Sequence, residues 1–225
     1  MERFFDILFS SIALLFLSPV LSLIGILLRL TGEGEVFFLQ ERIGMSGKKF
    51  KLLKFVTMQK NSPNIGTGSV TMRNDPRVLP VGRFLRKTKI NELPQLLNIL
   101  FGDMSLIGPR PLTNETFGVY PEDTQSIIKK VRPGLSGLGS IIFRGEEEMM
   151  HGSTASIDFY ENVIAPYKGA LEEWFVKNKS LYIYFIAIVI TAWTVLVPDA
   201  KIAWRVFKDL PEPPKELKQA LNYID

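Results

Sequence analysis

The chain contains no cysteine and only one histidine, His151, among its 225 residues. Without cysteine the protein has no disulfide framework, no thiolate chemistry and no zinc–cysteine site. A single histidine excludes a metal site built from several imidazoles, and His151 is interpreted as a surface residue. The sequence also has no internal repeat and no low-complexity segment.

Charged residues are absent from two long stretches, Ile7–Leu28 and Leu181–Val197. Apolar residues make up 46% of the chain and the mean hydropathy is +0.14, which is high for a soluble enzyme. The distribution predicts a membrane-associated protein with a polar middle. The net charge of +4 and a pI near 9.2 fit a chain that lies near anionic lipid, a phosphorylated ligand, or both.

The N-terminal stretch is long enough for one membrane crossing, because a spanning helix needs about 20 apolar residues. Ser18-Pro19 lies near its middle, and proline breaks or kinks a helix. The stretch is therefore either a kinked crossing or a re-entrant hairpin of two short helices. Arg3 and Arg29 both favour the cytoplasmic side, which favours the hairpin.

The C-terminal stretch is short for a crossing and is followed by the basic residues Lys201, Arg205 and Lys208. This pattern favours helices lying along the membrane interface over residues 181–210. An ordinary buried helix and a second crossing are the alternatives. Pro211 and the prolines after it end regular structure, so residues 211–225 are expected to form a surface tail.

The polar middle, residues 31–180, is predicted to be the cytoplasmic core, and residues 1–30 the membrane hairpin. Short strands are expected at Val36–Gln40 and Phe50–Met58, joined through Gly44 and Gly47. Helices are expected at Val81–Thr88, Leu93–Leu100 and Asp158–Phe175. The predicted fold is α+β, mainly helical, with one functional domain overall.

One segment of the core suggests phosphate chemistry. A basic cluster stands beside Glu92 and a helix predicted to start near Pro94; it contains Arg83, Arg86, Lys87 and Lys89. Free N–H groups at a helix start and basic side chains both bind phosphate. Glu92 could hold Mg²⁺ bridging phosphate oxygens. The plain alternative is a helix cap with solvated charges.

Two arginines beside prolines are further candidates for binding phosphate. Pro109 and Pro111 fix the backbone around Arg110, and Arg132 precedes Pro133-Gly134. A guanidinium held in this way suits bidentate phosphate recognition, although a structural ion pair is equally compatible. Lys54 and Arg73 are weaker candidates for the same role.

These segments occur together and in a fixed order. They are Lys54–Met58, Asn74–Val78, Gly82–Thr88, Glu92–Asn98, Gly102–Pro111 and Val131–Gly134. In this order the chain resembles the bacterial sugar transferase family, the monotopic phosphoglycosyl transferases, over about residues 3–208.

The resemblance implies that a nucleotide sugar, usually a UDP-sugar, gives its phosphosugar to polyprenol phosphate at the cytoplasmic face of the bacterial inner membrane. This reaction starts surface-glycan assembly. The resemblance further implies a re-entrant helix broken at Ser18-Pro19, interfacial helices in membrane lipid, and a need for Mg²⁺. It implies an Asp-Glu pair in which Asp is the nucleophile and Glu helps to hold the metal.

The sequence departs from the family at this pair, which falls on Asn91-Glu92. An amide is a very poor nucleophile. Four explanations remain open. Glu92 takes over as the nucleophile, or the acceptor phosphate attacks the sugar nucleotide directly. Alternatively, Asn91 is an engineered substitution, or the protein is a non-catalytic binding member. The other motifs are present, which favours an active fold.

The sequence does not identify the donor sugar or the oligomeric state, and it argues against nucleic-acid binding. The donor sugar is not readable, although Ser140–Gly152 differs from the usual family segment and could bear on donor choice. The oligomeric state is open and allows a homodimer. The basic residues cluster near one helix end without an aromatic stacking platform, which argues against nucleic-acid binding.

Overall fold

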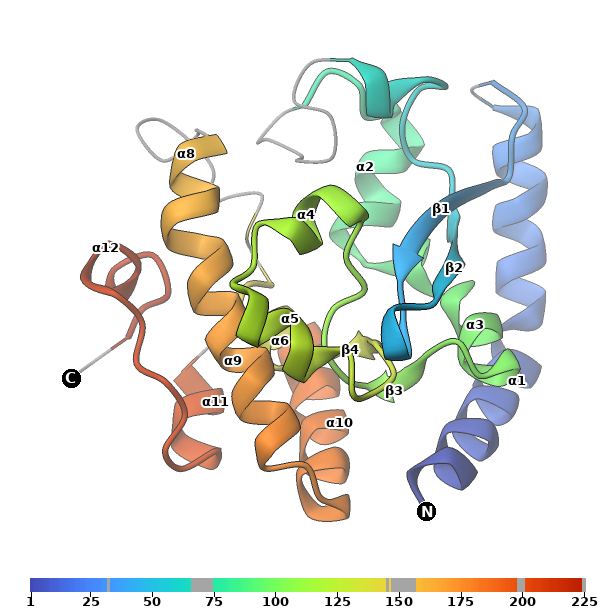
Figure 1. Ribbon diagram of the computed structural model, residues 1–225. Helices are drawn as coiled ribbons and strands as arrows, with labels where there is room; N and C mark the ends of the chain where they lie inside the picture. Colours follow the sequence, from blue (N-terminus) through green and yellow to red (C-terminus); the bar gives the residue numbers. More distant parts are fainter. Residues whose placement is uncertain (32, 66–74, 145, 147–156, 198–200, 224–225) are drawn as a thin grey trace.

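The computed structural model describes residues 1–31, 33–65, 75–144, 146, 157–197 and 201–223. Within these ranges helices dominate and two small two-stranded sheets accompany them, so the predicted mainly helical α+β class is confirmed. Figure 1 shows the long helix α1 along one side, the β1–β2 hairpin next to it, and α9 and α10 across the core.

The elements have the following bounds. The α-helices are α1 (Glu2–Leu30), α2 (Pro80–Lys87), α3 (Gln95–Phe101), α4 (Asn114–Gly118), α5 (Glu122–Ile128), α6 (Leu138–Ile142), α8 (Ile157–Phe159), α9 (Ala165–Lys177), α10 (Leu181–Leu196), α11 (Lys201–Val206) and α12 (Lys215–Lys218). The short 3₁₀ turns are η1 (Met45–Gly47), η2 (Ser62–Asn64) and η3 (Ile90–Glu92), and η5 (Tyr160–Ile164) is a π-helical turn before α9. The strands are β1 (Phe37–Ile43), β2 (Lys49–Phe55), β3 (Ser105–Ile107) and β4 (Gly134–Ser136).

The first sheet is the predicted hairpin. Strands β1 and β2 pair antiparallel, with Phe37 opposite Phe55 and Ile43 opposite Lys49. Gly47 closes the turn with φ of 75°, a left-handed conformation that glycine adopts without a Cβ clash. The hairpin is confirmed, and it carries Lys54 near the end of β2.

The second sheet was not predicted. Strands β3 and β4 pair parallel over only three residues each. Their backbones approach so closely that a Cβ at Gly134 would lie 2.1 Å from the Gly108 nitrogen. The pairing therefore requires glycine at this point and sets the Pro109–Pro111 loop beside Pro133 and Gly134.

Helix α1 runs without interruption through Pro19, so the predicted break into two helices is wrong. Proline 19 has no N–H for the Leu15 carbonyl, and the Ser18 hydroxyl donates to that carbonyl instead, at 2.9 Å. This substitute hydrogen bond lets the helix continue past the proline. The helix changes direction part-way along its length, as Figure 1 shows.

Both ends of α1 contact the same core. At the N-terminal end, Arg3 donates to the Leu100 carbonyl at 2.9 Å, where α3 ends. At the C-terminal end, Leu28 is buried with Phe55 of β2 and Leu85 of α2. Helix α1 therefore lies along the core rather than leading away from it.

One face of α1 packs against the core and the other is apolar and exposed. The inward residues recur at helical spacing and are Asp6, Ser10, Ala13, Leu14, Leu17, Leu21, Ile24 and Leu28. The exposed residues are Phe4, Ile7, Leu8, Ile12, Leu15, Phe16, Val20, Leu23, Ile26, Leu27 and Leu30. By length and composition, α1 is the one helix among the described residues that could cross a membrane.

The C-terminal region joins the largest core cluster. In α10, Tyr184, Ala187 and Ile190 are buried, whereas Trp193 on the same helix is half exposed. The expectation of a surface tail over residues 211–225 is wrong, because Leu217 and Leu221 are each only 1% exposed. The spacing of these two leucines places both on the inner side of the last turns.

A buried carboxylate ties α1 to the rest of the molecule. Asp6 Oδ1 accepts hydrogen bonds from the Ser105 hydroxyl at 2.9 Å, the Leu106 N–H at 2.9 Å and the Tyr184 hydroxyl at 2.8 Å. These donors belong to β3 and α10. Because a buried charge is tolerated only when it is well hydrogen-bonded, this one oxygen fixes where three elements meet.

Replacing Asp6 with alanine should destabilise the fold by about 3 kcal/mol or more, since three buried donors lose their acceptor. Tyr184→Phe, which removes one donor and leaves the other two in place, should cost only about 1 kcal/mol. Chemical unfolding in detergent micelles would measure both values. Equal losses for the two variants would contradict the central role given to Asp6.

Candidate active site

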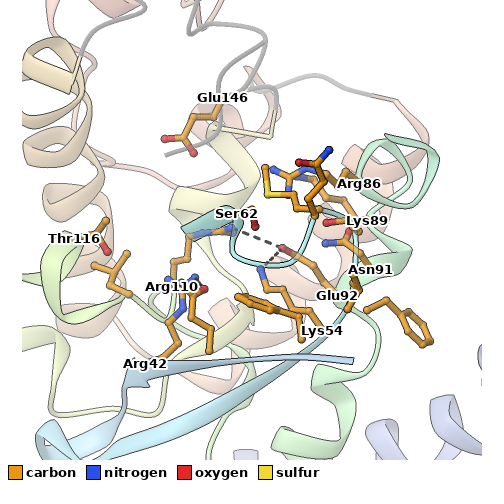
Figure 2. A pocket seen from close by; sticks show the side chains of 18 of the residues that line it. Arg42, Lys54, Ser62, Arg86, Lys89, Asn91, Glu92, Arg110, Thr116 and Glu146 are labelled. Atoms are coloured by element: carbon orange, nitrogen blue, oxygen red, sulfur yellow. Dashed lines mark hydrogen bonds and ion pairs between the residues drawn. The ribbon is translucent and has the colours of Figure 1, made fainter. Parts of the chain in front are cut away.

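The described residues enclose a cavity of about 290 Å³ on the outer side of the hairpin. Its walls come from β1, the end of β2, the η2 and η3 turns, the loop around Arg110, and the start of α9. Figure 2 shows basic and acidic side chains converging on this space from both sides. Segments distant in sequence therefore meet here.

Glu92 is the centre of the site. Its Oε1 accepts a hydrogen bond from Lys54 Nζ at 3.0 Å and lies 3.7 Å from Arg110 Nη2 (Figure 2). The Lys54 and Glu92 side chains are only 18% and 16% exposed. One carboxylate thus joins β2, η3 and the Arg110 loop.

This arrangement changes the ionisation of both partners. Burial by itself would raise the pKa of Glu92, but the positive charges of Lys54, Arg110 and Lys89 hold that pKa well below its usual range. Burial lowers the pKa of Lys54 to about 8, and Glu92 only partly offsets this effect. Glu92 is therefore an anion at neutral pH, and Lys54 is a cation close to its titration point.

Asn91 lines the same cavity beside Glu92 and is only 5% exposed. Its Oδ1 is buried and has no hydrogen-bond partner among the residues that the structure describes. An unpaired buried acceptor costs stability unless a ligand or ion meets it. Asn91 is thus placed to contact whatever occupies the cavity.

The turn between α2 and η3 brings this pair to the cavity. Lys89 adopts a left-handed conformation, with φ of 61°, directly before η3. Such a conformation is uncommon for a residue with a Cβ and is found where the surrounding fold demands it. Arg86 and Lys89 line the cavity next to Asn91 (Figure 2).

The Arg110 loop is held from behind by a buried carboxylate on α9. Glu172 Oε1 accepts the Arg110 N–H at 3.3 Å. Burial raises the pKa of Glu172 to about 7, against the lowering effects of Arg110 and Lys168. The prolines on either side of Arg110 and this contact constrain its backbone, and its guanidinium reaches Glu92.

Arg42 and Lys168 were missed at the level of sequence, and Glu146 was covered only by the segment Ser140–Gly152. Arg42 on β1 lines the cavity, and its Nη1 donates to the Pro111 carbonyl at 3.1 Å. Lys168 on α9 pairs with Glu146 across the opposite wall. Arg42 sits in an alternating strand and Lys168 in an amphipathic helix, where charged residues usually face water, so no local signal marks them.

The predicted phosphate-binding residues separate into three groups. Lys54, Arg86 and Arg110 line the cavity with Asn91 and Glu92. Lys87 is exposed and Arg132 lies elsewhere, with its Nε donating to the Gly102 carbonyl at 2.9 Å and so capping α3. Arg73 and His151 lie outside the described residues.

The site as built favours a phosphorylated ligand. Lys54, Arg110 and Arg42 face it as cations, and Glu92 supplies the one negative charge at their centre. Charge-assisted hydrogen bonds from such groups are the strongest that proteins make to phosphate oxygens. The excess of positive charge selects for an anion, and Asn91 adds an amide that can both donate and accept.

Comparison with known proteins gives a consistent result. The family model for bacterial sugar transferases matches residues 1–198. The exopolysaccharide production protein ExoY of Rhizobium meliloti (strain 1021) is 36% identical over 171 residues, which are 70% of this chain and 74% of that protein.

Longer relatives carry names that state an activity. The UDP-glucose:undecaprenyl-phosphate glucose-1-phosphate transferase of Escherichia coli (strain K12) is 39% identical over 163 residues, which are 71% of this chain but 35% of the relative. The UDP-N-acetylgalactosamine-undecaprenyl-phosphate N-acetylgalactosaminephosphotransferase of Aeromonas hydrophila is 34% identical over 197 residues, covering 87% of this chain and 43% of the relative. The chain thus spans well under half of these two proteins.

Removing the charge of Glu92 should lower the pKa of Lys54 below about 8, because Glu92 is the partner that stabilises the ammonium form. After reductive methylation with ¹³C-formaldehyde, an NMR titration would follow the Lys54 resonance, assigned with Lys54→Arg. Glu92→Gln should move the midpoint to lower pH. Glu41→Gln, which removes one partner of the exposed Lys49–Glu41 pair, should leave it unchanged.

An unchanged Lys54 midpoint in Glu92→Gln would contradict the close electrostatic pairing. An equal shift in the Glu41→Gln control would show that the midpoint reports net charge and not this contact.

Proposed function

Since the chain belongs to the bacterial sugar transferase family, we propose that it transfers a sugar phosphate from a nucleotide sugar to polyprenol phosphate. The observation that carries this proposal is Glu92 between Lys54 and Arg110 in a cavity with further cations on its walls. A diphosphate-containing donor matches this charge pattern. Relatives named as undecaprenyl-phosphate sugar phosphotransferases support the same reaction class.

The donor is proposed to be a UDP-sugar and the acceptor a polyprenol phosphate embedded in the cytoplasmic leaflet. Arg3 and Leu28, near the two ends of α1, contact one core, so both ends of this helix belong on the same side of the membrane. The exposed apolar faces of α1 and α10 then meet lipid. This placement brings a lipid-linked acceptor to the surface of the core. The transfer would then start glycan assembly on the cytoplasmic face.

Mg²⁺ is proposed to enter the site together with the donor. The described residues hold no cluster of three or more acidic, histidine or cysteine side chains suited to a metal. Mg²⁺ does not need one, because it often uses one or two protein oxygens, waters and substrate phosphates. The Glu92 carboxylate and the unpaired Asn91 oxygen are the protein atoms that fit it, and the ion would neutralise phosphate charge.

Asn91 is proposed to bind and position the donor, because its amide cannot serve as a carboxylate nucleophile. Two routes then remain for the transfer. In one, a Glu92 oxygen bonds to the β-phosphorus and UMP leaves, after which the acceptor phosphate displaces Glu92. In the other, the acceptor oxygen attacks the β-phosphorus directly and UMP leaves in the same step.

A second function fits the same site. The protein could bind a nucleotide sugar or lipid-linked sugar without transfer, and the amide at Asn91 is the observation that favours this alternative. Both functions use the same cations, so only turnover separates them.

Release of UMP from a panel of UDP-sugars with polyprenol phosphate and Mg²⁺ tests the proposed function. We expect slow turnover by the chain as written and a rise of roughly a hundredfold or more in Asn91→Asp, since restoring a nucleophile recovers covalent catalysis. Lys177→Met, far from the cavity lining, should leave the rate unchanged. No UMP from either the native chain or Asn91→Asp would exclude the transferase, and binding without turnover by the native chain would favour the second function.

Any covalent intermediate in the native chain should lie on Glu92. Intact-mass and peptide analysis after incubation with donor alone should then show a phosphosugar adduct on the Glu92 peptide, and Glu92→Gln should show none. Turnover without an adduct would favour direct attack. An adduct on any other residue would contradict the role given to Glu92.

A further inference from the structure

A second charged pair, Lys168 and Glu146, also lines the cavity. Figure 2 shows Glu146 well apart from Glu92 and Lys54. Lys168 Nζ donates to both Glu146 oxygens, at 2.7 and 2.8 Å. Lys168 is only 5% exposed, and its ammonium also lies 5.2 Å from the Phe143 ring centre and 5.8 Å from the Tyr160 ring centre. The pair is built into the wall and is not a solvated surface contact.

The pair differs in charge from the rest of the cavity. Lys168 and Glu146 together are neutral, whereas the cations around Glu92 leave an excess of positive charge. Phosphate therefore gains little from this part of the wall and much from the other. A carboxylate that accepts and an ammonium with a third N–H left to donate instead suit neutral hydroxyl groups.

The location of the Lys168–Glu146 pair in the cavity indicates which part of the donor would contact it. Phe38, Gln40 and Arg42 line the cavity, so it follows β1 for about 13 Å. Glu35, before the strand, lines the cavity as well.

Lys168 lies one helical turn before Glu172 on α9, and Glu172 accepts the Arg110 N–H. Arg42 donates to the Pro111 carbonyl of the same loop, so the Lys168 wall lies at the Arg42 end of the cavity. This end adjoins the cations around Glu92.

A sugar ring bonded directly to the diphosphate fits this end, beside the cations that would hold the phosphates, and the nucleoside fits the stretch along β1 toward Glu35. We propose that the Lys168–Glu146 pair, with Tyr160 beside it, binds hydroxyl groups of the donor's sugar and sets which sugar is accepted. The proposal rests on the proposed function, because it assigns one part of the same donor. It concerns recognition alone and involves no bond to the sugar.

Binding measurements test this assignment without depending on turnover at Asn91. Isothermal titration of the full chain in nanodiscs would give dissociation constants for UDP and for UDP-glucose, UDP-galactose and their two N-acetylated counterparts. In the native chain we expect at least one UDP-sugar to bind more tightly than UDP. In Glu146→Gln and Lys168→Met that advantage should fall by about tenfold, while the affinity for UDP stays within about twofold.

Two control variants separate this role from others. Lys177→Met removes an exposed lysine from the same helix and should change neither constant. Lys54→Gln removes a phosphate contact and should weaken UDP and every UDP-sugar by the same factor. Glu146 is partly exposed, so Glu146→Gln keeps the test decisive if the more buried Lys168→Met does not fold.

Equal weakening of UDP and all UDP-sugars in Glu146→Gln would overturn the assignment in favour of a base or phosphate contact. An unchanged preference among sugars would overturn it as well. A native chain that binds neither UDP nor any UDP-sugar would instead contradict the proposed function itself.

Discussion

The contact of Glu92 with Lys54 and Arg110 is the interaction on which the site depends. The three residues come from different parts of the chain: β2, the η3 turn and the loop after β3. Removing ionised groups from water is costly, and only close opposite charges and hydrogen bonds offset that cost. The cluster therefore holds the hairpin, the η3 turn and the Arg110 loop in one arrangement. Its excess positive charge is also what a phosphorylated donor would meet, so the same contact that organises the core organises the ligand site.

Asp6 joins the apolar helix α1 to the core, as Glu92 joins the elements of the site. Its single oxygen receives three donors from β3 and α10, and α1 is thereby fixed against the core along its inward face. The outward face is left apolar, which is stable only where lipid replaces water. Strand β3 leads directly to Gly108 and the Arg110 loop, so the strand that holds Asp6 of α1 also carries the loop that reaches Glu92. This continuity explains how a site for a water-soluble donor can stand close to a lipid-borne acceptor.

The sequence predicted the parts of this structure that rest on local chemistry. The hairpin follows from alternating residues around Gly44 and Gly47, and α3 ends at Gly102 in a left-handed conformation that glycine favours. The grouping of Lys54, Arg110 and Glu92 followed from the order of the motifs. Arg132 could not be told from Arg110, because both are arginines beside proline and only the β3–β4 pairing sends one to α3 and the other to the cavity. The segment that contains Glu146 was noted for donor choice, but its pairing with Lys168 was not predicted, since two charges far apart in sequence give no local sign that the fold buries them together.

The neutral amide of Asn91 affects both the charge of the cavity and the chemistry available in it. With aspartate at this position two neighbouring carboxylates would share the cations, whereas here Glu92 is the carboxylate in contact with Lys54 and Arg110. The amide leaves the cavity more positive by one charge, which strengthens the attraction for a diphosphate in its ground state. Rate enhancement requires interactions that grow stronger in the transition state, and uniform attraction for the bound donor does not supply them. In the proposed reaction the amide at Asn91 therefore favours binding over transfer, and transfer through Glu92 requires its carboxylate to leave Lys54 and approach the phosphorus.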